Sequence, residues 1–555
     1  MIRNKYWIII LLAVLILPVN GCKDLDKLNV NPNGVDPTIA DLNLLMPTVL
    51  VATGQRVVDL GIGDIAGVMQ HTQLDGWTGG HNEYDWNILS HSWSAYYDIL
   101  RNNDEYYNKA LEGDYLFHQG VALVMKAYAF GMIADLWGDA PYTEALKAEE
   151  GDEHFKPVFD GQRDIYLGIL EDLKTANTLL SLDRGEYEGI IPSQDVLYRG
   201  DPSKWRRFAN SLALRYYMRL SEKEPGIAEN GIREIVSNPG EFPIIVIHTD
   251  DANIGYIGTS APVSWPTSME FNPDPSGAYM RRKMCSTLVE AMQENNDPRL
   301  SVWANKVEIP LVLVTGEEID RIVELPDGSE QREVSQDIVD KYESAFGLPV
   351  NFDPEYVGIP PAISSALAYN MTPDLDQGVF NPHCSHLSDM YMESAHELLQ
   401  MRLLSASEVH FILAETALRG WIATTPEEHY EAGIRQSLNA WGVGSDFEEY
   451  LDGVPYNGLE SIIRQKWIAS WTAATESWFD WRRTGFPELQ VGEAAVRDAL
   501  PLRFYYHADN EIAKNQANAE AAIARLEPTP YKGSDVSNNS AWSKIWVLQG
   551  TGKPY

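Results

Sequence analysis

Residues 70–86, "QHTQLDGWTGGHNEYDW", interleave aromatic and polar side chains with glycines. Sugar binding needs flat apolar faces for C–H surfaces, framed by polar groups that hydrogen-bond hydroxyls. The glycines disfavour a regular element, so we expect a loop whose rings are not packed by helical periodicity, although Trp86 could instead fold beneath it. The stretch predicts a saccharide-binding surface, with stacking residues Trp77, Tyr84 and Trp86 and polar residues Asp75, His81 and Asn82.

Two further tryptophans lie in segments that we predict to be loops. Trp265 precedes a proline in "SAPVSWPTSMEFNPDPSGAYM", and Trp303 follows "DPRLSV". Both are candidate stacking residues, Trp303 being the weaker choice. Other aromatic residues recur at helical spacing, which predicts packing between helices. These are Trp93 and Tyr97, which share a stripe with Leu100, and Trp205, Trp421, Trp441, Trp467, Trp471, Trp478 and Trp481.

Metal-binding and catalytic patterns are weak in this chain. "NPHCSHLSD" offers His383, Cys384, His386 and Asp389, but at no recognised spacing for zinc. The motifs G-x-S-x-G and H-E-x-x-H and a glycine-rich phosphate loop are missing from the sequence. An acid pair of the glycosidase kind has no sequence spacing that would identify it. We therefore predict a protein that is not an enzyme, with no metal and no cofactor.

The balance of charge narrows the possible partners. The chain has 43 Lys and Arg against 80 Asp and Glu, a net charge of −37. Phosphates would be repelled, so nucleic acid and anionic membrane surfaces are excluded as partners. There are 3 cysteines and no CxxC pair. Cys285 and Cys384 could form a disulfide or remain two buried thiols.

The N-terminus has the pattern of a secretory signal. A basic start precedes an apolar run from Tyr6 to Leu17, too short for a typical membrane span. Gly21-Cys22 then looks like a bacterial lipobox, in which the cysteine is acylated. We predict a signal peptide over 1–21, lipidation at Cys22 and a tether over 22–40. The alternatives are an unlipidated secreted protein and an N-terminal membrane helix.

The remaining residues, 41–555, are expected to form a single, mostly α-helical domain. Apolar periodicity predicts helices over 115–137, 160–182, 202–221, 226–237 and 457–479, and a hairpin over 402–442 that resembles a tetratricopeptide repeat. Such hairpins would form a scaffold over about 100–240 and 400–480. An irregular, loop-rich part over about 240–395 would contain short strands at "FPIIVIHTDD" and "VEIPLVLVTG".

Several segments together resemble the SusD/RagB family of outer-membrane nutrient-binding lipoproteins of Gram-negative bacteria. They occur in family order across nearly the whole mature chain. They are the lipobox with "NPNGVDP", "AFGMIADLWGDAPYTEAL", "DPSKWRRFANSLALRYYMRLS", "NNDPRLSVWA", "SASEVHFILAETALRGW", "RQKWIASWTAATESWFDWRRTGFPEL", "LPLRFYYHADNEIAKNQAN" and "WSKIWV".

The resemblance implies a helical body of four tetratricopeptide-like units and an irregular half that carries the ligand site. It implies a lipid-anchored protein on the cell surface that acts as a lid over a SusC-like TonB-dependent transporter. Its ligand would be an oligosaccharide or polysaccharide; the alternative is a peptide, which one branch of the family takes. The resemblance also places a stacking aromatic just before the helix that begins near Ser90, within the 70–86 stretch.

Overall fold

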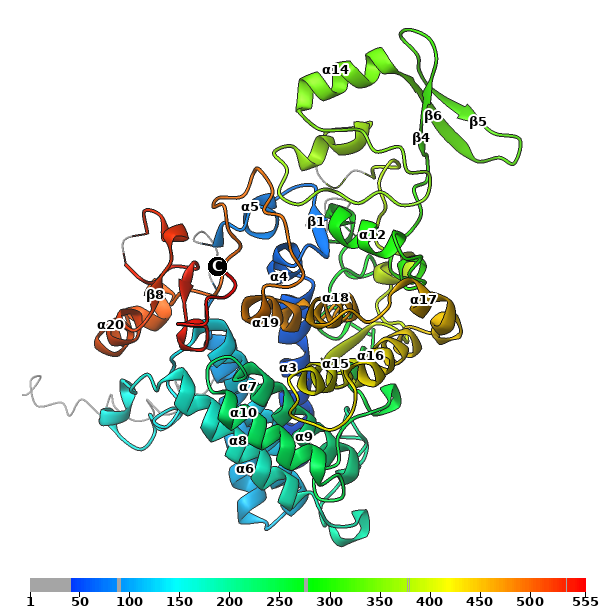
Figure 1. The fold of residues 1–555 in the computed structure, drawn as a ribbon. Helices are drawn as coiled ribbons and strands as arrows, with labels where there is room; N and C mark the ends of the chain where they lie inside the picture. Colours follow the sequence, from blue (N-terminus) through cyan, green and yellow to red (C-terminus); the bar gives the residue numbers. More distant parts are fainter. Residues whose placement is uncertain (1–40, 87–90, 274–277, 377, 379, 536) are drawn as a thin grey trace, which may run out of the picture.

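The computed structural model describes residues 41–86, 91–273, 278–376, 378, 380–535 and 537–555. The expected signal peptide, the tether and Cys22 lie outside the described residues. Figure 1 shows a helical body with a smaller part that projects from one end.

Helices make up most of the regular structure, as expected from the sequence. The longer ones are α3 (Leu42–Gly61), α6 (Ser94–Glu112), α7 (Leu116–Trp137), α8 (Gln162–Leu179), α9 (Pro202–Arg219), α10 (Pro225–Ser237), α12 (Ser286–Gln293), α14 (Gln336–Phe346), α15 (Ala406–Leu418), α16 (Pro426–Ala440), α18 (Leu459–Ala469), α19 (Ala474–Thr484) and α20 (Gln516–Ala524). The shorter ones are α4 (Asp64–Val68), α5 (Thr78–His81), α11 (Ala278–Arg281), α13 (Leu300–Trp303) and α17 (Phe447–Gly453).

The strands are short and form small separate sheets. Antiparallel pairs are β1 (Thr72–Leu74) with β3 (Arg282–Met284), β2 (Ala252–Gly255) with β7 (Gln400–Leu404), and β8 (Glu527–Pro528) with β9 (Ser543–Lys544). In the remaining sheet, β6 (Glu330–Ser335) lies between β4 (Leu311–Val314), which is parallel to it, and β5 (Asp320–Glu324), which is antiparallel.

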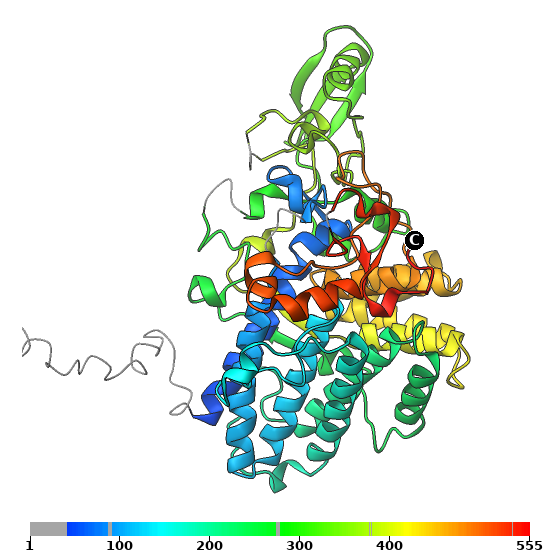
Figure 2. The same ribbon diagram turned by 90° about the vertical axis from the view of Figure 1, so that its left-hand side faces the viewer.

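Helices α6 to α10 form one end of the body, where they lie side by side (Figure 2). Helix α7 confirms the expected helix over 115–137 and is the only helix of the described residues long and apolar enough to cross a membrane. Because 94% of its apolar window is buried inside the protein, it serves here as the central core helix.

Helix α3 runs from this layer to α4 and β1 (Figure 1). Two glycines one heptad apart allow it to approach its neighbours closely. A Cβ on Gly54 would lie 2.6 Å from Sδ of Met401 in β7, and one on Gly61 would lie 2.3 Å from the carbonyl oxygen of Thr472. The first described helix therefore packs against segments from the last third of the chain.

Helices α15 and α16 confirm the predicted hairpin over 402–442. Helix α16 begins with a capping box, in which Thr425 and Glu428 satisfy each other's backbone N–H groups, followed by Pro426 at the first helical position. The hairpin encloses a small apolar core with α17 and α18.

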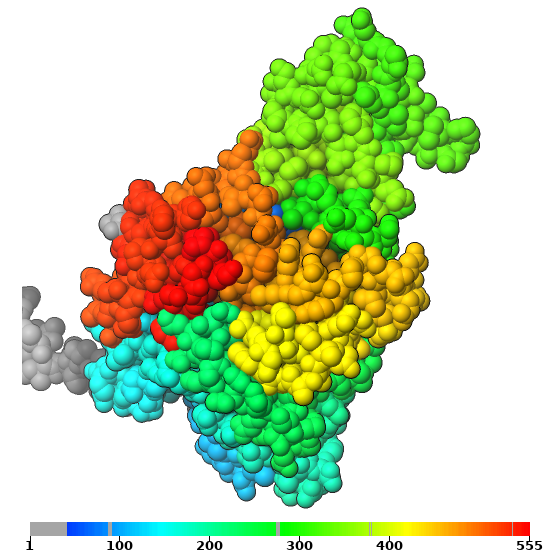
Figure 3. Space-filling view, viewed as in Figure 1, coloured from blue at the N-terminus to red at the C-terminus, as the bar shows by residue number. Residues whose placement is uncertain are grey.

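The projecting part, residues 306–385, is called the lobe below (Figure 3). It contains the β4–β6–β5 sheet and α14, which have an apolar core separate from that of the body. At its base the chain enters and leaves side by side, because the N–H of Asn305 donates to the carbonyl of His386 at 2.9 Å. Strand β4 confirms the expected strand in "VEIPLVLVTG".

Two sequence predictions were wrong in detail. The helix expected over 457–479 is broken into α18 and α19 at Thr472, whose φ of +66° no helix accommodates. The segment "FPIIVIHTDD" does not contain the expected strand; β2 begins only after it. Its backbone is bonded by side chains instead: Ser211 accepts from the N–H of Ile245, and Asn210 donates to the carbonyl of Pro243.

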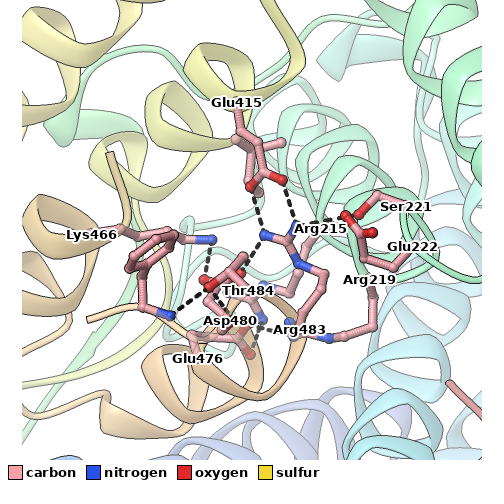
Figure 4. Close-up of polar contacts among 12 residues, drawn as sticks. Arg215, Arg219, Ser221, Glu222, Glu415, Lys466, Glu476, Asp480, Arg483 and Thr484 are labelled. Atoms are coloured by element: carbon pink, nitrogen blue, oxygen red, sulfur yellow. Dashed lines mark hydrogen bonds and ion pairs between the residues drawn. The ribbon is translucent and has the colours of Figure 1, made fainter. Parts of the chain in front are cut away.

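A buried network of ion pairs joins the helices of the body (Figure 4). On α9, Arg215 contacts Glu408 at 2.7 Å, and Arg219 contacts Glu476 at 2.7 Å. Burial alone would raise the pKa of Asp480, but Lys466 and Arg483 hold that pKa well below its ordinary value. Other members are Asp135, Glu415 and Arg419. Buried charges are tolerated only when they are paired, so these side chains depend on one another.

The two cysteines of the described residues are both free and buried, which settles the alternative left open by the sequence. Cys384 belongs to the core of the lobe, and Cys285 immediately precedes α12. Among the described residues, no three His, Cys, Asp or Glu side chains gather closely enough to hold a metal ion. His383 instead contacts the carbonyl of Ile309.

Candidate functional site

The 70–86 stretch folds into a tight loop at the foot of the lobe (Figure 1). Strand β1 is paired with β3 in the register Thr72↔Met284 and Leu74↔Arg282. The chain then turns through residues 75–77 into the single-turn helix α5. Trp77 precedes α5 in the left-handed conformation, with φ of +59°, and its side chain is 74% exposed. Such a backbone is strained by roughly 1–2 kcal/mol for a residue with a Cβ, so the surrounding loop must impose it.

The three polar residues predicted to contact ligand are instead buried and hold the loop closed. Asn82 pairs with both backbone groups of Leu74, each at 2.8 Å. His81 contacts Thr72, and Asp75 forms an ion pair with Nζ of Lys283 at 3.1 Å. Burial raises the pKa of Asp75 and lowers that of Lys283, so each charge relies on the other. These side chains position Trp77 and do not face solvent.

Tyr84 and Trp86 were predicted to stack on a sugar, but both are fully buried. The Trp86 ring packs edge-on against Trp478 and Phe504, and its Nε1 donates to the carbonyl of Gly80 at 3.1 Å. The loop is irregular, as its glycines indicate, but it folds its large rings inward over the core. The alternative in which Trp86 folds beneath the loop is therefore the one observed.

Trp265 and Trp303 are also core residues in this structure. Trp265 packs against Tyr391, and its Nε1 donates to Thr267 at 2.8 Å. Trp303 stacks on Trp471. A neighbouring proline predicts irregular backbone, and irregular backbone can still lie in the interior. The tryptophans expected between helices are buried as predicted, except Trp421, which is only partly buried.

The structure adds three residues that sequence reasoning missed. The guanidinium carbon of Arg281 lies 5.9 Å from the centre of the Trp77 ring. Lys283 anchors the loop from β3, as described above. Phe380 is 40% exposed, and its ring stacks on the ring of His386. The backbone of His386 forms an isolated antiparallel β-bridge with Lys283. Arg281 and Lys283 could have been found from the sequence, because they belong to the run Arg281-Arg282-Lys283, three consecutive cations in a chain rich in acids.

Gly67 in α4 provides the space into which α5 packs. A Cβ at this position would lie 2.0 Å from the carbonyl oxygen of His81, which is backbone and cannot move alone. We expect Gly67→Ala to reduce the free energy of unfolding by about 1–3 kcal/mol and to displace Trp77. Thermal unfolding and tryptophan emission measure both effects. Gly226→Ala is the control, because nothing lies within 4 Å of the added Cβ. It should leave the emission unchanged and should not lower the free energy of unfolding, since alanine is favoured over glycine in a helix such as α10.

A separate open hollow of about 560 Å³ lies between α12, α18 and residues 487–490. Glu290, Glu294, Glu460 and Glu488 line it, with Arg464 paired to Glu294 at 2.8 Å. Its lining also includes the apolar side chains of Ala291, Leu489 and the buried Trp467, but not Trp77. The strongly exposed indole therefore lies at the loop and not in this hollow.

The sequence of the chain was compared with models of protein families. A SusD-like family model, described as "starch-binding associating with outer membrane", matches residues 45–341 and 355–507, which is most of the chain. The chain belongs to the SusD-like family. The family's description associates this SusD-like protein with the outer membrane.

Solved structures share the fold over almost the whole SusD-like chain. An outer membrane protein of Bacteroides vulgatus linked to nutrient binding is 24% identical, with a TM-score of 0.69 over 92% of this chain and 100% of its own. A SusD homolog of Bacteroides fragilis is 21% identical, with a TM-score of 0.67 over 91% and 99%. A chitin-binding SusD homolog from Flavobacterium johnsoniae is 19% identical, with a TM-score of 0.65 over 91% and 99%. A comparison with curated proteins gives no match.

Proposed function

We propose that this protein captures an oligosaccharide or polysaccharide at the cell surface, with Trp77 as the stacking residue. The observation that carries the proposal is the Trp77 side chain, 74% exposed on a strained and firmly closed loop. This indole offers its apolar face to a ligand, and the closed loop holds that face in place. The family's starch-binding description and the chitin-binding relative support a glycan as the ligand.

The Trp77 loop is built to resist movement when a ligand binds. Asn82, His81 and the Asp75–Lys283 pair fix the backbone on either side of Trp77. A ring that is already held in place loses little conformational entropy on binding, so more of the stacking energy contributes to affinity. Phe380, the exposed ring stacked on His386, offers a second apolar face near β3.

The proposal extends to how the protein is held and where the glycan goes. Gly21-Cys22 and the preceding apolar run support a lipid anchor at Cys22 and a position on the outer surface of the outer membrane. Delivery to a SusC-like TonB-dependent transporter rests on the family resemblance. In this proposal, the helical body is the scaffold and the Trp77 loop presents the captured chain.

Trp77→Ala tests the binding surface. We expect it to weaken glycan binding by about 2 kcal/mol, roughly 30-fold in Kd, because an aromatic anchor is lost while the fold is kept. Binding is measured by retardation in native gels containing α-glucan, β-glucan, mannan, xylan, chitin derivatives or pectin, and then by calorimetry with the retarding polymer.

Phe155→Ala is the matched control, since this residue is also exposed, at 59%, but lies in the helical turn Asp152–Phe155 between α7 and α8. It should bind like the parent. Unchanged binding by Trp77→Ala would overturn the proposed surface. If the parent protein bound casein peptides and no polysaccharide, the ligand would be a peptide and the glycan proposal would fail.

A further inference from the structure

The loop that presents Trp77 rests on an unusual concentration of positive charge. Arg281, Arg282 and Lys283 are consecutive where α11 meets β3, in a chain whose net charge is −37. Among the described residues, Lys283 is the one of the three that has a carboxylate within ion-pair distance, namely Asp75. Arg282 donates to the carbonyl of Ile62 and lies beneath the loop.

Arg281 is the cation that reaches the surface of the loop. Its side chain is partly exposed, and its guanidinium stands 5.9 Å from the Trp77 ring centre. Within the part of the chain that the structure describes, its Nε has no hydrogen-bond partner. The carboxylate of Asp75 is near enough to interact electrostatically with Arg281, but it already forms its ion pair with Lys283.

Among the described residues, the Nε of Arg281 has no hydrogen-bond partner, and this guanidinium lies beside an exposed indole. The indole offers a face to the sugar ring, and the guanidinium offers paired N–H donors to a planar carboxylate or to a sulfate. A cation–π contact at an exposed site contributes only about 0.5–1 kcal/mol, so Arg281 can exchange it for a charge-assisted hydrogen bond.

We infer that the ligand is an acidic glycan, whose carboxylate or sulfate group is bound by Arg281 while a sugar ring lies on Trp77. The inference rests on the proposed function. The overall negative charge opposes it only at long range, because charges more than about 8 Å apart are largely screened at physiological ionic strength. At contact distance, the guanidinium of Arg281 attracts an anionic group of the ligand.

The test compares glycans that differ in charge but not in backbone. Polygalacturonate is paired with its methyl ester, and chondroitin sulfate with its desulfated and its carboxyl-reduced forms, so that carboxylate and sulfate are distinguished. Calorimetry at two salt concentrations would measure binding by the parent, Arg281→Gln, Arg281→Lys and Trp77→Ala. Arg321→Gln is the control, because its exposed side chain is paired with Glu333 on the lobe.

We expect the parent to bind an acidic glycan at least 10-fold more tightly than its neutralised form. Arg281→Gln should abolish that preference, Arg281→Lys should retain part of it, and Arg321→Gln should leave it intact. Tight binding of neutral glycans that Arg281→Gln does not alter would overturn the inference and leave the proposed function standing. No binding of any glycan by a folded parent would overturn both.

Discussion

Replacing Glu476 with alanine is expected to lower the free energy of unfolding by about 3–5 kcal/mol. Glu476 is buried on α19 and contacts both Arg219, at 2.7 Å, and Arg215, at 3.4 Å. Its removal leaves two buried guanidinium groups short of negative charge. Arg215 retains Glu408 and Arg219 retains Asp135, which keeps the effect within that range. Calorimetric unfolding of the purified chain would measure it.

The control for Glu476→Ala is Glu448→Ala. Glu448 also forms an ion pair, with Arg435 at 3.2 Å, but its side chain is 81% exposed. Exposed pairs contribute about 0–1 kcal/mol, so the control should unfold almost like the parent. If the two variants unfolded at the same temperature, the buried ion pairs of Glu476 would contribute no more to the stability of the protein than an exposed pair does. That result would contradict the prediction.

Acidification from pH 7 to pH 5 is expected to destabilise the protein by roughly 3 kcal/mol or more. His71, His81 and His386 are buried around the β1–β3 pair, and burial lowers the pKa of each to about 3. Between that value and the ordinary 6.5, the unfolded chain takes up protons that the folded chain does not. Stability is therefore full above pH 6.5 and falls as the pH is lowered, by ~2 kcal/mol per histidine at pH 5.

Asp251 acts in the opposite direction. Burial raises the pKa of its carboxyl to about 8, so the folded chain holds a proton that the unfolded chain releases, and this group favours folding as the pH falls. Its effect offsets ~3 kcal/mol of the histidine effect over the same range. His429, whose pKa is lowered to about 4, adds to the loss.

Two isosteric or near-isosteric variants separate these contributions. Asp251→Asn keeps an oxygen for the N–H of Ala406 but removes the titration, so unfolding temperatures should fall more steeply between pH 7 and pH 5. His386→Gln removes one of the three histidines and should make the fall shallower. An unfolding temperature that is constant across this range in the parent would refute the assignment of neutral buried histidines.

Apolar periodicity predicted the helical body well, because the apolar face of each of these helices is the face that packs against its neighbours. Helices α7, α8, α9 and α10 coincide with the expected segments to within a few residues. Of the stripe expected to be buried, Trp93 and Leu100 are buried and Tyr97 is partly buried. The break at Thr472 was not predictable from periodicity, because it depends on Gly61 from α3, more than 400 residues earlier, meeting the turn.

The candidate site was predicted as a segment but not as a set of side chains. The glycines favoured a loop, but the stretch contains β1 and the single-turn helix α5, with irregular backbone only at residues 75–77 and after His81. Neither outcome reveals from the sequence which way a ring points. Trp77 faces solvent while Trp86 lies in the core, although both have similar neighbours in sequence. The polar partners of Asp75 come from β3, so the burial of that carboxylate could not be read from its own loop.

The position of α3 has a consequence for the order in which the molecule can assemble. This helix is the first of the described elements to be synthesised, yet β7 and the α18–α19 turn pack against it from beyond residue 400. Contacts between residues so distant in the chain form slowly, because a long loop must close before they stabilise anything. Until the chain extends past Thr484, the buried face of α3, which includes Val49, Leu50 and Val58, lacks its final partners. A nascent or truncated chain therefore exposes this apolar face, and completion of the fold waits for its C-terminal third.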